Sequence, residues 1–196
     1  MDLQKSPWLH FEDMFQQALK VEVEASAMSL ATSTLQGRPS VRVVLYKGRV
    51  QNGLMFVTNY ESHKGQQLSE NPWASSVFYW PHSFQQIRFE GRVHKLARSE
   101  SQAYFATRPR LSQIGAWASS QSQILKSQEE LRQKVLYFEK KFQGQEIPCP
   151  EHWGAYTLVP QLVEFWLGRQ GRLHERYVYE SSKSDFSEWK SYLLQP

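Results

Sequence analysis

The chain is nearly free of cysteine, since Cys149 is the only one in 196 residues. A single thiol cannot form an intrachain disulfide, and it cannot build a zinc site of several cysteines. The six histidines do not cluster, and His63 has no partner at metal-ligand spacing, so we expect no metal. This cysteine usage is typical of a reducing compartment, and we expect a cytoplasmic protein.

Long apolar runs are also missing. No stretch approaches the ~18 apolar residues of a membrane span, and the N-terminus has no apolar signal core. The formal net charge is +4, but the basic residues are scattered and never form a run of five or six. Such scatter argues against a nucleic-acid-binding surface. We therefore expect neither a membrane nor a nucleic acid among the partners.

The order of the periodic patterns indicates an α+β protein, with a mainly antiparallel β-barrel and helices packed outside it. Ser6-Pro7 begins an amphipathic helix, and short β-type runs separated by turn signals follow it. We expect a single domain over 1–196, made of an N-terminal helix (1–22), the first barrel strands (27–96), a helical section (98–142) and C-terminal strands (153–196).

Within these sections the patterns predict individual elements. In the helical section, a short helix around Tyr104 ends at Pro109. A long helix spans 122–142, with Leu131, Val135, Phe138 and Phe142 as its buried stripe. Strands are predicted at 28–34, 41–46, 54–58, 74–80, 86–96, 154–159, 162–166, 173–179 and 189–194.

The decapeptide from Arg108 to Trp117, Arg-Pro-Arg-Leu-Ser-Gln-Ile-Gly-Ala-Trp, combines two guanidinium groups with a hydroxyl. An arginine fork matches the oxygens of phosphate or carboxylate, and serine can complete such a shell. Tyr104, four residues before Arg108, shares its helix face. We infer an anion site that favours phosphate, and the alternative is a helix end with solvated arginines.

Two segments nearer the N-terminus carry further cations. Strict alternation in the strand around Val41 puts Arg42 and Lys47 on opposite faces, so they could serve two different anions or could simply be solvated. The segment Thr58–Lys64 leads from a strand into a helix and combines hydroxyls with the pair His63-Lys64. Free N–H groups at a helix start form a phosphate cradle, although the same composition suits an ordinary cap.

A third cationic segment lies near the C-terminus. If it is a strand, Arg172, His174 and Arg176 point to one face. Two fixed charges and an imidazole repel one another unless an anion or an acidic partner is present. Trp166, on the preceding strand, could line a pocket for a flat ligand or fill the core.

Together these segments resemble the pyridoxine/pyridoxamine 5′-phosphate oxidase family. The resemblance runs in one order from about Ala27 to the C-terminus without large gaps. It implies a homodimer of split β-barrels with FMN at the interface, and its two phosphates agree with the two anions suggested by Arg42 and Lys47. The segments that carry it are Val41–Lys47, Thr58–Lys64, Arg108–Trp117, Gln121-Ser122 and Trp166–Arg176.

The resemblance also implies roles for individual residues, and it assigns none to Arg110. FMN would be held, chiefly at its phosphate, by Arg42, Thr58 and Lys64, with Gln86 on the flavin. Gln121, Ser122, Trp166 and Arg176 would complete this site, partly from the second subunit. The substrate phosphate would be bound by Lys47, Tyr104, Arg108 and Ser112. Arg172 and His174 would be catalytic and lie over the pyridine ring, with Leu173 as a further substrate contact. The remaining cofactor contacts would be Val43, Val44, Leu45, Tyr46, Lys47, Val57 and His63.

The implied reaction is the oxidation of pyridoxine 5′-phosphate or pyridoxamine 5′-phosphate to pyridoxal 5′-phosphate. Hydride passes to the flavin, and dioxygen reoxidises the flavin and gives hydrogen peroxide. The amine substrate also loses ammonia. Because the flavin carries the redox chemistry, the protein supplies position and electrostatics.

The chain departs from the family pattern at several places. His63 stands where the family usually has arginine, so we expect weaker FMN retention above neutral pH. Val57 occupies a position that is often aromatic. Few residues precede Pro7, where family members often carry a basic, tyrosine-containing segment, and the chain ends Leu-Leu-Gln-Pro rather than Arg-Leu-x-Pro.

Three alternatives stay open at this point. One is a related FMN split-barrel oxidase that acts on another aromatic substrate, as in phenazine-type biosynthesis. Another is a module that binds FMN or pyridoxal phosphate without turnover. The third is a basic nucleic-acid-binding barrel.

Overall fold

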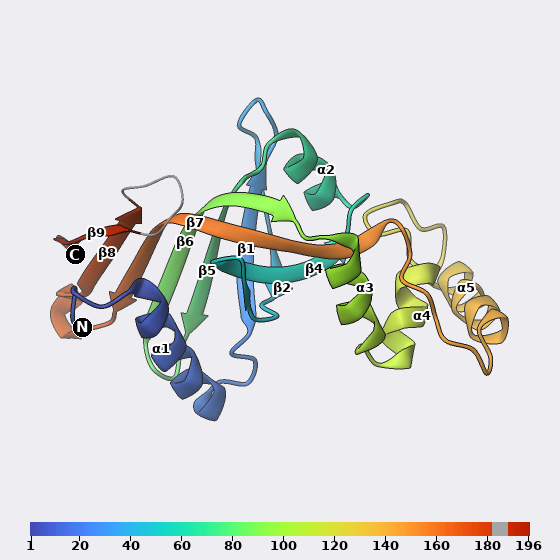
Figure 1. Ribbon diagram of the computed structural model, residues 1–196, viewed down its shortest axis with the longest axis horizontal. Helices are drawn as coiled ribbons and strands as arrows, with labels where there is room; N and C mark the ends of the chain where they lie inside the picture. The colour runs from blue at the N-terminus through green and yellow to red at the C-terminus, as the bar shows by residue number, and fades with distance from the viewer. Residues whose placement is uncertain (182–187) are drawn as a thin grey trace.

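The computed structural model describes residues 1–181 and 188–196, and its centre is one antiparallel sheet (Figure 1). The strand order is β2-β1-β5-β6-β7-β4-β3, with β8 beside β7 and β9 beside β8. The α+β class with an antiparallel sheet is therefore confirmed. The strands are β1 (Ala27–Ser33), β2 (Pro39–Leu45), β3 (Arg49–Val50), β4 (Gly53–Asn59), β5 (Trp73–Trp80), β6 (Gln85–Lys95), β7 (Trp153–Leu167), β8 (Glu175–Ser181) and β9 (Trp189–Leu194).

In the order of the sheet, β2 and β4 stand at opposite ends of the row β2-β1-β5-β6-β7-β4. Backbone hydrogen bonds between the chain after β2 and strand β4 join these two ends and close the barrel. The Lys47 N–H donates to the Met55 carbonyl at 2.8 Å, and the Met55 N–H donates to Gly48 at 2.9 Å. The long strand β7 pairs with β6 along one edge, and it pairs with β4 and then with β8 along the other. One strand thus links the barrel to the β8–β9 hairpin.

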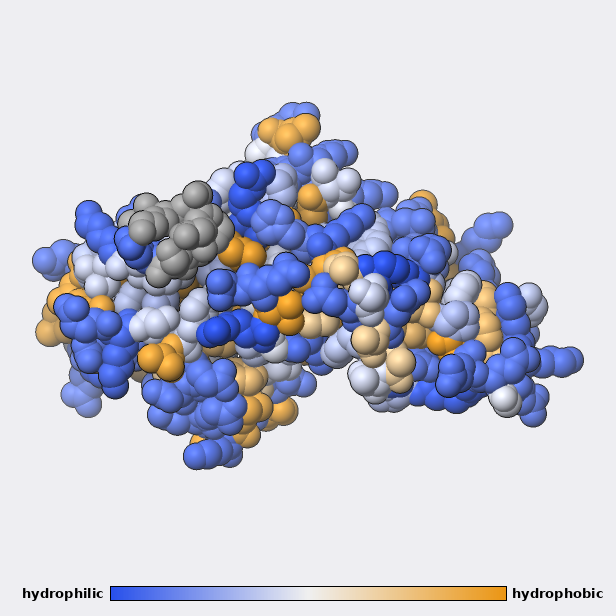
Figure 2. Space-filling view, viewed as in Figure 1, coloured by the Kyte–Doolittle hydropathy of each residue, from blue (hydrophilic) through white to orange (hydrophobic). Residues whose placement is uncertain are grey.

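The helices surround the sheet, and none of those described is long and apolar enough to cross a membrane. In Figure 1 the lobe formed by α3, α4 and α5 lies at the opposite end of the molecule from β8 and β9. Figure 2 shows the same lobe projecting from the rest of the molecule, and most of the surface visible in this view is hydrophilic. The helices are α1 (Pro7–Val21), α2 (His63–Glu70), α3 (Arg98–Ala106), α4 (Arg110–Ala118) and α5 (Gln128–Lys141).

The expected N-terminal helix forms as α1 and packs its aromatic face on the sheet. The Ser6 hydroxyl accepts from the Trp8 N–H, which caps the first turn. Trp8 stacks on Phe89 at 5.9 Å between ring centroids, and Phe11 lies edge-on to the same ring at 5.3 Å. Aromatic residues from this helix and from several strands therefore make up much of the core.

The helical section differs from its prediction. The helix expected over 122–142 begins at Gln128, because Ser127 caps it and Ser122 has φ of 71°, outside the helical region. Leu131, Val135 and Phe138 are only half-buried, since α5 packs on α4 rather than on the sheet. The helix α4 itself was not predicted, because Pro109 was interpreted as a helix end although it also starts the next helix.

Three strand predictions were also wrong in their bounds. Strands expected at 154–159 and 162–166 form the single strand β7, and Pro160 is accommodated at a bulge opposite Gly91. The strand expected at 173–179 begins at Glu175, and Arg172 lies in a 3-10 turn with φ of 61°. Alternation along a strand therefore does not place Arg172, His174 and Arg176 on one face.

Candidate active site

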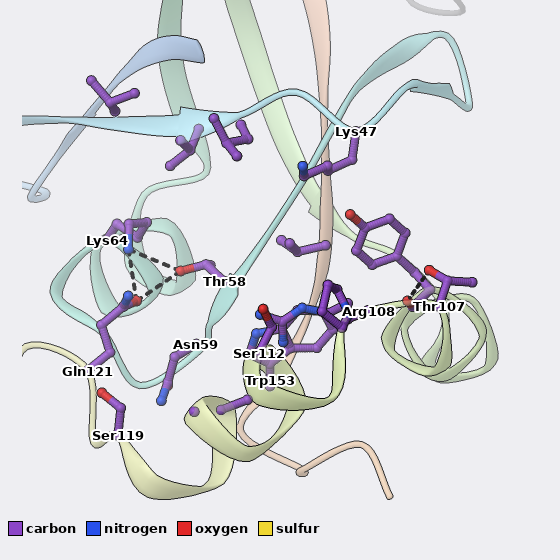
Figure 3. Close-up of a pocket in the computed structure, with 18 residues that line it drawn as sticks. Lys47, Thr58, Asn59, Lys64, Thr107, Arg108, Ser112, Ser119, Gln121 and Trp153 are labelled. Carbon is purple, nitrogen blue, oxygen red and sulfur yellow. Dashed lines mark hydrogen bonds between the residues drawn. The ribbon is translucent and has the colours of Figure 1, made fainter. Parts of the chain in front are cut away.

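A cavity of about 620 Å³ lies between the barrel and the helical lobe (Figure 3). The strands β2 and β4 form one wall, α2 lies at one end, and α3 and α4 form the opposite wall. Its polar lining residues come from segments far apart in the sequence. Eleven predicted site residues meet there, namely Val43, Val44, Leu45, Lys47, Val57, Thr58, Lys64, Tyr104, Arg108, Ser112 and Gln121.

Lys64 is the buried cation at one end of the cavity, and only 8% of it is exposed. Its Nζ donates to Thr58 Oγ1 and to Gln121 Oε1, both at 3.0 Å. Figure 3 shows these three side chains pointing toward one another. Burial, and then the charge of Arg42, lowers the pKa of Lys64 to about 8. Within the described residues no carboxylate pairs with Lys64, so an anion would supply the charge that this end lacks.

Arg42 lies behind this end rather than in the cavity wall. Its Nη1 donates to Thr32 Oγ1 at 2.6 Å and to the Leu30 carbonyl at 3.1 Å, and burial lowers its pKa. Arg42 thus adds positive potential next to Lys64.

Arg108 is the cation at the other end of the cavity. Its guanidinium lies over the Trp153 ring at 4.5 Å, and Tyr104 stacks nearly parallel to the same ring. Burial lowers the pKa of Arg108, and its Nη1 is buried without a hydrogen-bond partner among the described residues. A buried donor without a partner is costly, so this nitrogen fits an anionic ligand. Lys47 and Ser112 line the same end (Figure 3).

Arg110 has a different environment from Arg108, although only Pro109 separates them in the chain. Its guanidinium donates to the Phe142 carbonyl at 2.5 Å and to the Gln145 carbonyl at 3.1 Å. Phe142 follows the last turn of α5, and a cation there stabilises the negative end of the helix dipole. Arg110 therefore ties α4 to the end of α5 and does not line the cavity.

A second group of predicted site residues lies at the far end of the molecule, on β6, β7, β8 and the segment between β7 and β8 (Figure 1). Gln86 is opposite Trp166 and Trp166 is opposite Arg176 in the sheet register. The Trp166 and His174 rings are 4.4 Å apart. None of the second group lines the cavity, and its members are Gln86, Trp166, Arg172, Leu173, His174 and Arg176.

Arg176 is held by a charge network that was not predicted from the sequence. Glu164 is 3% exposed and accepts from Arg176 Nε and from Arg88 Nη2, both at 2.7 Å. Burial would raise the pKa of Glu164, but the hydrogen bonds from Arg176 and Arg88 outweigh it and keep the pKa below its usual value. The sequence does contain an indication of this network, since Glu164 is a single carboxylate inside the apolar run of β7. A carboxylate is buried in such a place only when it has charged or hydrogen-bonding partners.

Three further predicted cofactor residues do not line the cavity. Tyr46 packs in the aromatic core against Phe11 at 5.4 Å. His63 is exposed on the first turn of α2. Ser122 lies in the loop after α4, in a separate depression that also contains Gln121.

Residues 12–142 match the family model described as pyridoxamine 5′-phosphate oxidase. The chain belongs to the pyridoxine/pyridoxamine 5′-phosphate oxidase family. It is an oxidoreductase of this family, as predicted. Residues 153–196 match a second model, described as the pyridoxine 5′-phosphate oxidase C-terminal dimerisation region.

Curated relatives named pyridoxine/pyridoxamine 5′-phosphate oxidase support the assignment along the whole chain. The one from Bdellovibrio bacteriovorus is 45% identical over 196 residues, which cover 100% of this chain and 99% of that protein. The one from Acaryochloris marina is 46% identical and is matched over 100% of this chain and 88% of its own length.

Solved structures share the fold. PhzG from Burkholderia lata 383, solved in complex with tetrahydrophenazine-1-carboxylic acid, matches with a TM-score of 0.90 and 33% identity, over 97% of this chain and 93% of that one. A pyridoxamine 5′-phosphate oxidase-related, FMN binding protein from Nostoc punctiforme matches over 100% of both chains with a TM-score of 0.78 and 20% identity. The predicted split β-barrel is therefore confirmed.

Proposed function

We propose that this chain oxidises pyridoxamine 5′-phosphate or pyridoxine 5′-phosphate to pyridoxal 5′-phosphate, with FMN as cofactor and O2 as electron acceptor. The observation that carries the proposal is a single cavity with a cation at each end. Lys64 at one end and Arg108 at the other each lack a carboxylate partner among the described residues. Two cationic ends suit a cofactor phosphate and a substrate phosphate.

The residues at the Lys64 end fit the phosphate of FMN. Lys64 on the first turn of α2 and Thr58 near the end of β4 offer donors, and Arg42 strengthens the positive potential. Val43, Val44 and Leu45 provide an apolar strand edge beside them, which suits a flat ring system. When bound, FMN supplies the hydride acceptor.

The residues at the Arg108 end fit the substrate phosphate. Arg108 is pre-oriented by the Trp153 ring, and its buried Nη1 is available to a phosphate oxygen. Lys47, Tyr104 and Ser112 add donors from three segments, namely the chain after β2, α3 and α4. Holding both phosphates restricts how the pyridine ring meets the cofactor, which is the way that proximity lowers a barrier.

A homodimer explains why the second group lies far from the cavity. One side of the sheet is uncovered, since Val41 and Val43 of β2 are 69% and 63% exposed and Tyr79 of β5 is 53% exposed. The same side carries Trp166 and Arg176 at its other end. A second copy packed on this surface would bring the partner subunit's Trp166 and the partner subunit's Arg176 to the cavity. The dimerisation region matched by residues 153–196 supports this assembly.

The decisive experiment is an anaerobic titration of the FMN-loaded protein with pyridoxamine 5′-phosphate and pyridoxine 5′-phosphate. We expect loss of the visible flavin absorbance, and formation of peroxide when air is admitted. Arg108→Gln should raise KM for both substrates, whereas Arg110→Gln is the matched control that removes a neighbouring charge outside the cavity. Absence of bleaching with both substrates would refute the proposal.

A second candidate substrate class is favoured by one observation, the 0.90 TM-score to PhzG. A reduced tricyclic carboxylic acid would present a carboxylate in place of a phosphate. Bleaching of the flavin by such a compound, without bleaching by either B6 phosphate, would support this candidate instead.

A further inference from the structure

Phe84, in the turn between β5 and β6, has a backbone conformation that is unusual for its residue type. Its φ is 52°, in the left-handed region that bulky side chains rarely adopt. The turn is tied to the end of β7, because the Gly168 N–H donates to the Phe84 carbonyl at 2.9 Å. A Cβ atom on Gly168 would collide with the Phe84 ring, so the ring lies directly on the glycine backbone. The strained turn therefore holds an aromatic ring at one defined place.

That place is beside Trp166 and His174. The Phe84 ring is 5.3 Å from Trp166 and 6.3 Å from His174 between centroids, and it is edge-on to both, at 80° and 74°. Trp166 and His174 are themselves 4.4 Å apart. The imidazole is thus held by two aromatic rings from two other segments, and Phe84 remains 47% exposed.

A backbone hydrogen bond sets which nitrogen of His174 carries the proton. The Arg169 N–H donates to His174 Nδ1 at 3.1 Å. A nitrogen that accepts a hydrogen bond carries no proton, so the neutral ring in this arrangement is protonated on Nε2. Nε2 has no hydrogen-bond partner among the described residues, and its N–H remains available to a ligand.

We propose that Phe84 is a positioning residue, which acts with Trp166 and the Arg169 N–H to present His174 Nε2–H as a hydrogen-bond donor to the substrate. His174 then orients the pyridine ring through an acceptor atom and takes no proton from it. That the acceptor belongs to a pyridine substrate rests on the proposed function. The orientation and the tautomer of His174 are argued from the structure alone and do not depend on the proposed function.

The first test needs no substrate. Nitrogen NMR of ¹⁵N-histidine-labelled protein, with His174→Ala to assign the signals, should show a pyridine-like Nδ1 and a pyrrole-like Nε2. Phe84→Leu keeps an apolar side chain but removes the ring, and it should convert His174 into a mixture of tautomers. Phe84→Tyr restores the ring and should restore the single tautomer. An unchanged tautomer in Phe84→Leu would overturn the proposal.

The second test measures flavin reduction by pyridoxamine 5′-phosphate in single turnovers. We expect Phe84→Leu to slow reduction about 10-fold, with FMN dissociation nearly unchanged. In a His174→Ala background the same substitution should have little further effect, because the two residues act as a unit. Equal slowing in both backgrounds would show that Phe84 acts independently of His174. If the unmodified protein reduces no flavin, the proposed function fails and the NMR result still decides the role of Phe84.

Discussion

We expect Lys64 to couple FMN binding to proton uptake. In the free protein, burial and then the charge of Arg42 lower its pKa to about 8. A phosphate dianion beside the ammonium favours the charged form, so we expect binding to return the pKa to at least its ordinary value of about 10.4. Between these two values the complex binds more protons than the free protein. Affinity must therefore fall as pH rises through this interval.

The magnitude follows from the two pKa values. Half of the free protein has lost the Lys64 proton at pH 8, and most of it at pH 9. The FMN dissociation constant should therefore be about tenfold higher at pH 9 than at pH 7, with a limiting cost of about 3 kcal/mol at still higher pH. The phosphate does not contribute to this change, since its second pKa is about 6.

Isothermal titration calorimetry measures this coupling directly. At pH 8 and above, the observed enthalpy should depend on the ionisation enthalpy of the buffer, with uptake of about half a proton at pH 8 and nearly one at pH 9. Lys64→Arg is the matched control, because a guanidinium stays charged throughout this range and should remove the slope. Equal affinity at pH 7 and pH 9 in the unmodified protein, or an equal slope in Lys64→Arg, would refute the reasoning.

Three further predictions concern other charged groups. His63→Arg should slow FMN dissociation, because a guanidinium adds a permanent positive charge on the first turn of α2. Stopped-flow fluorescence measures the rate, and an unchanged rate would contradict the prediction. Co-expression of Arg108→Ala with His174→Ala should restore activity to about one quarter of the unmodified level. Half of the dimers are then mixed, and each mixed dimer has one intact site out of two. If each site were built within a single chain, co-expression would restore no activity. Glu164→Gln should raise the FMN dissociation constant and lower the free energy of unfolding by about 2 kcal/mol. The reason is that Arg88 and Arg176, both partly buried, lose the carboxylate that they share. An unchanged denaturation midpoint would exclude a stabilising role for Glu164.

Local sequence patterns were enough for the fold class, most strands and the family. Alternating apolar residues identify the strands over 27–96, because one side of each barrel strand must be buried. Local patterns gave the wrong bounds where a helix or strand depends on a contact with a distant part of the chain. Two strands were predicted at 154–159 and 162–166, but one strand, β7, runs through Pro160, which lies at a bulge opposite Gly91 of β6. The start of α5 depends on its cap at Ser127 and on packing against α4.

The candidate site divides in the same way. Residue type and spacing identified Lys64, Arg108 and His174 as candidate ligand-binding residues. The reason is that fixed charges and an imidazole in such runs suit anionic ligands. Long-range packing determined what each one does in the structure. It gives Arg108 a buried nitrogen without a protein partner among the described residues, and it makes Arg110 a cap for α5. The environments of Glu164 and Phe84 depend on neighbours from other strands and turns, and no local pattern records which residues those are.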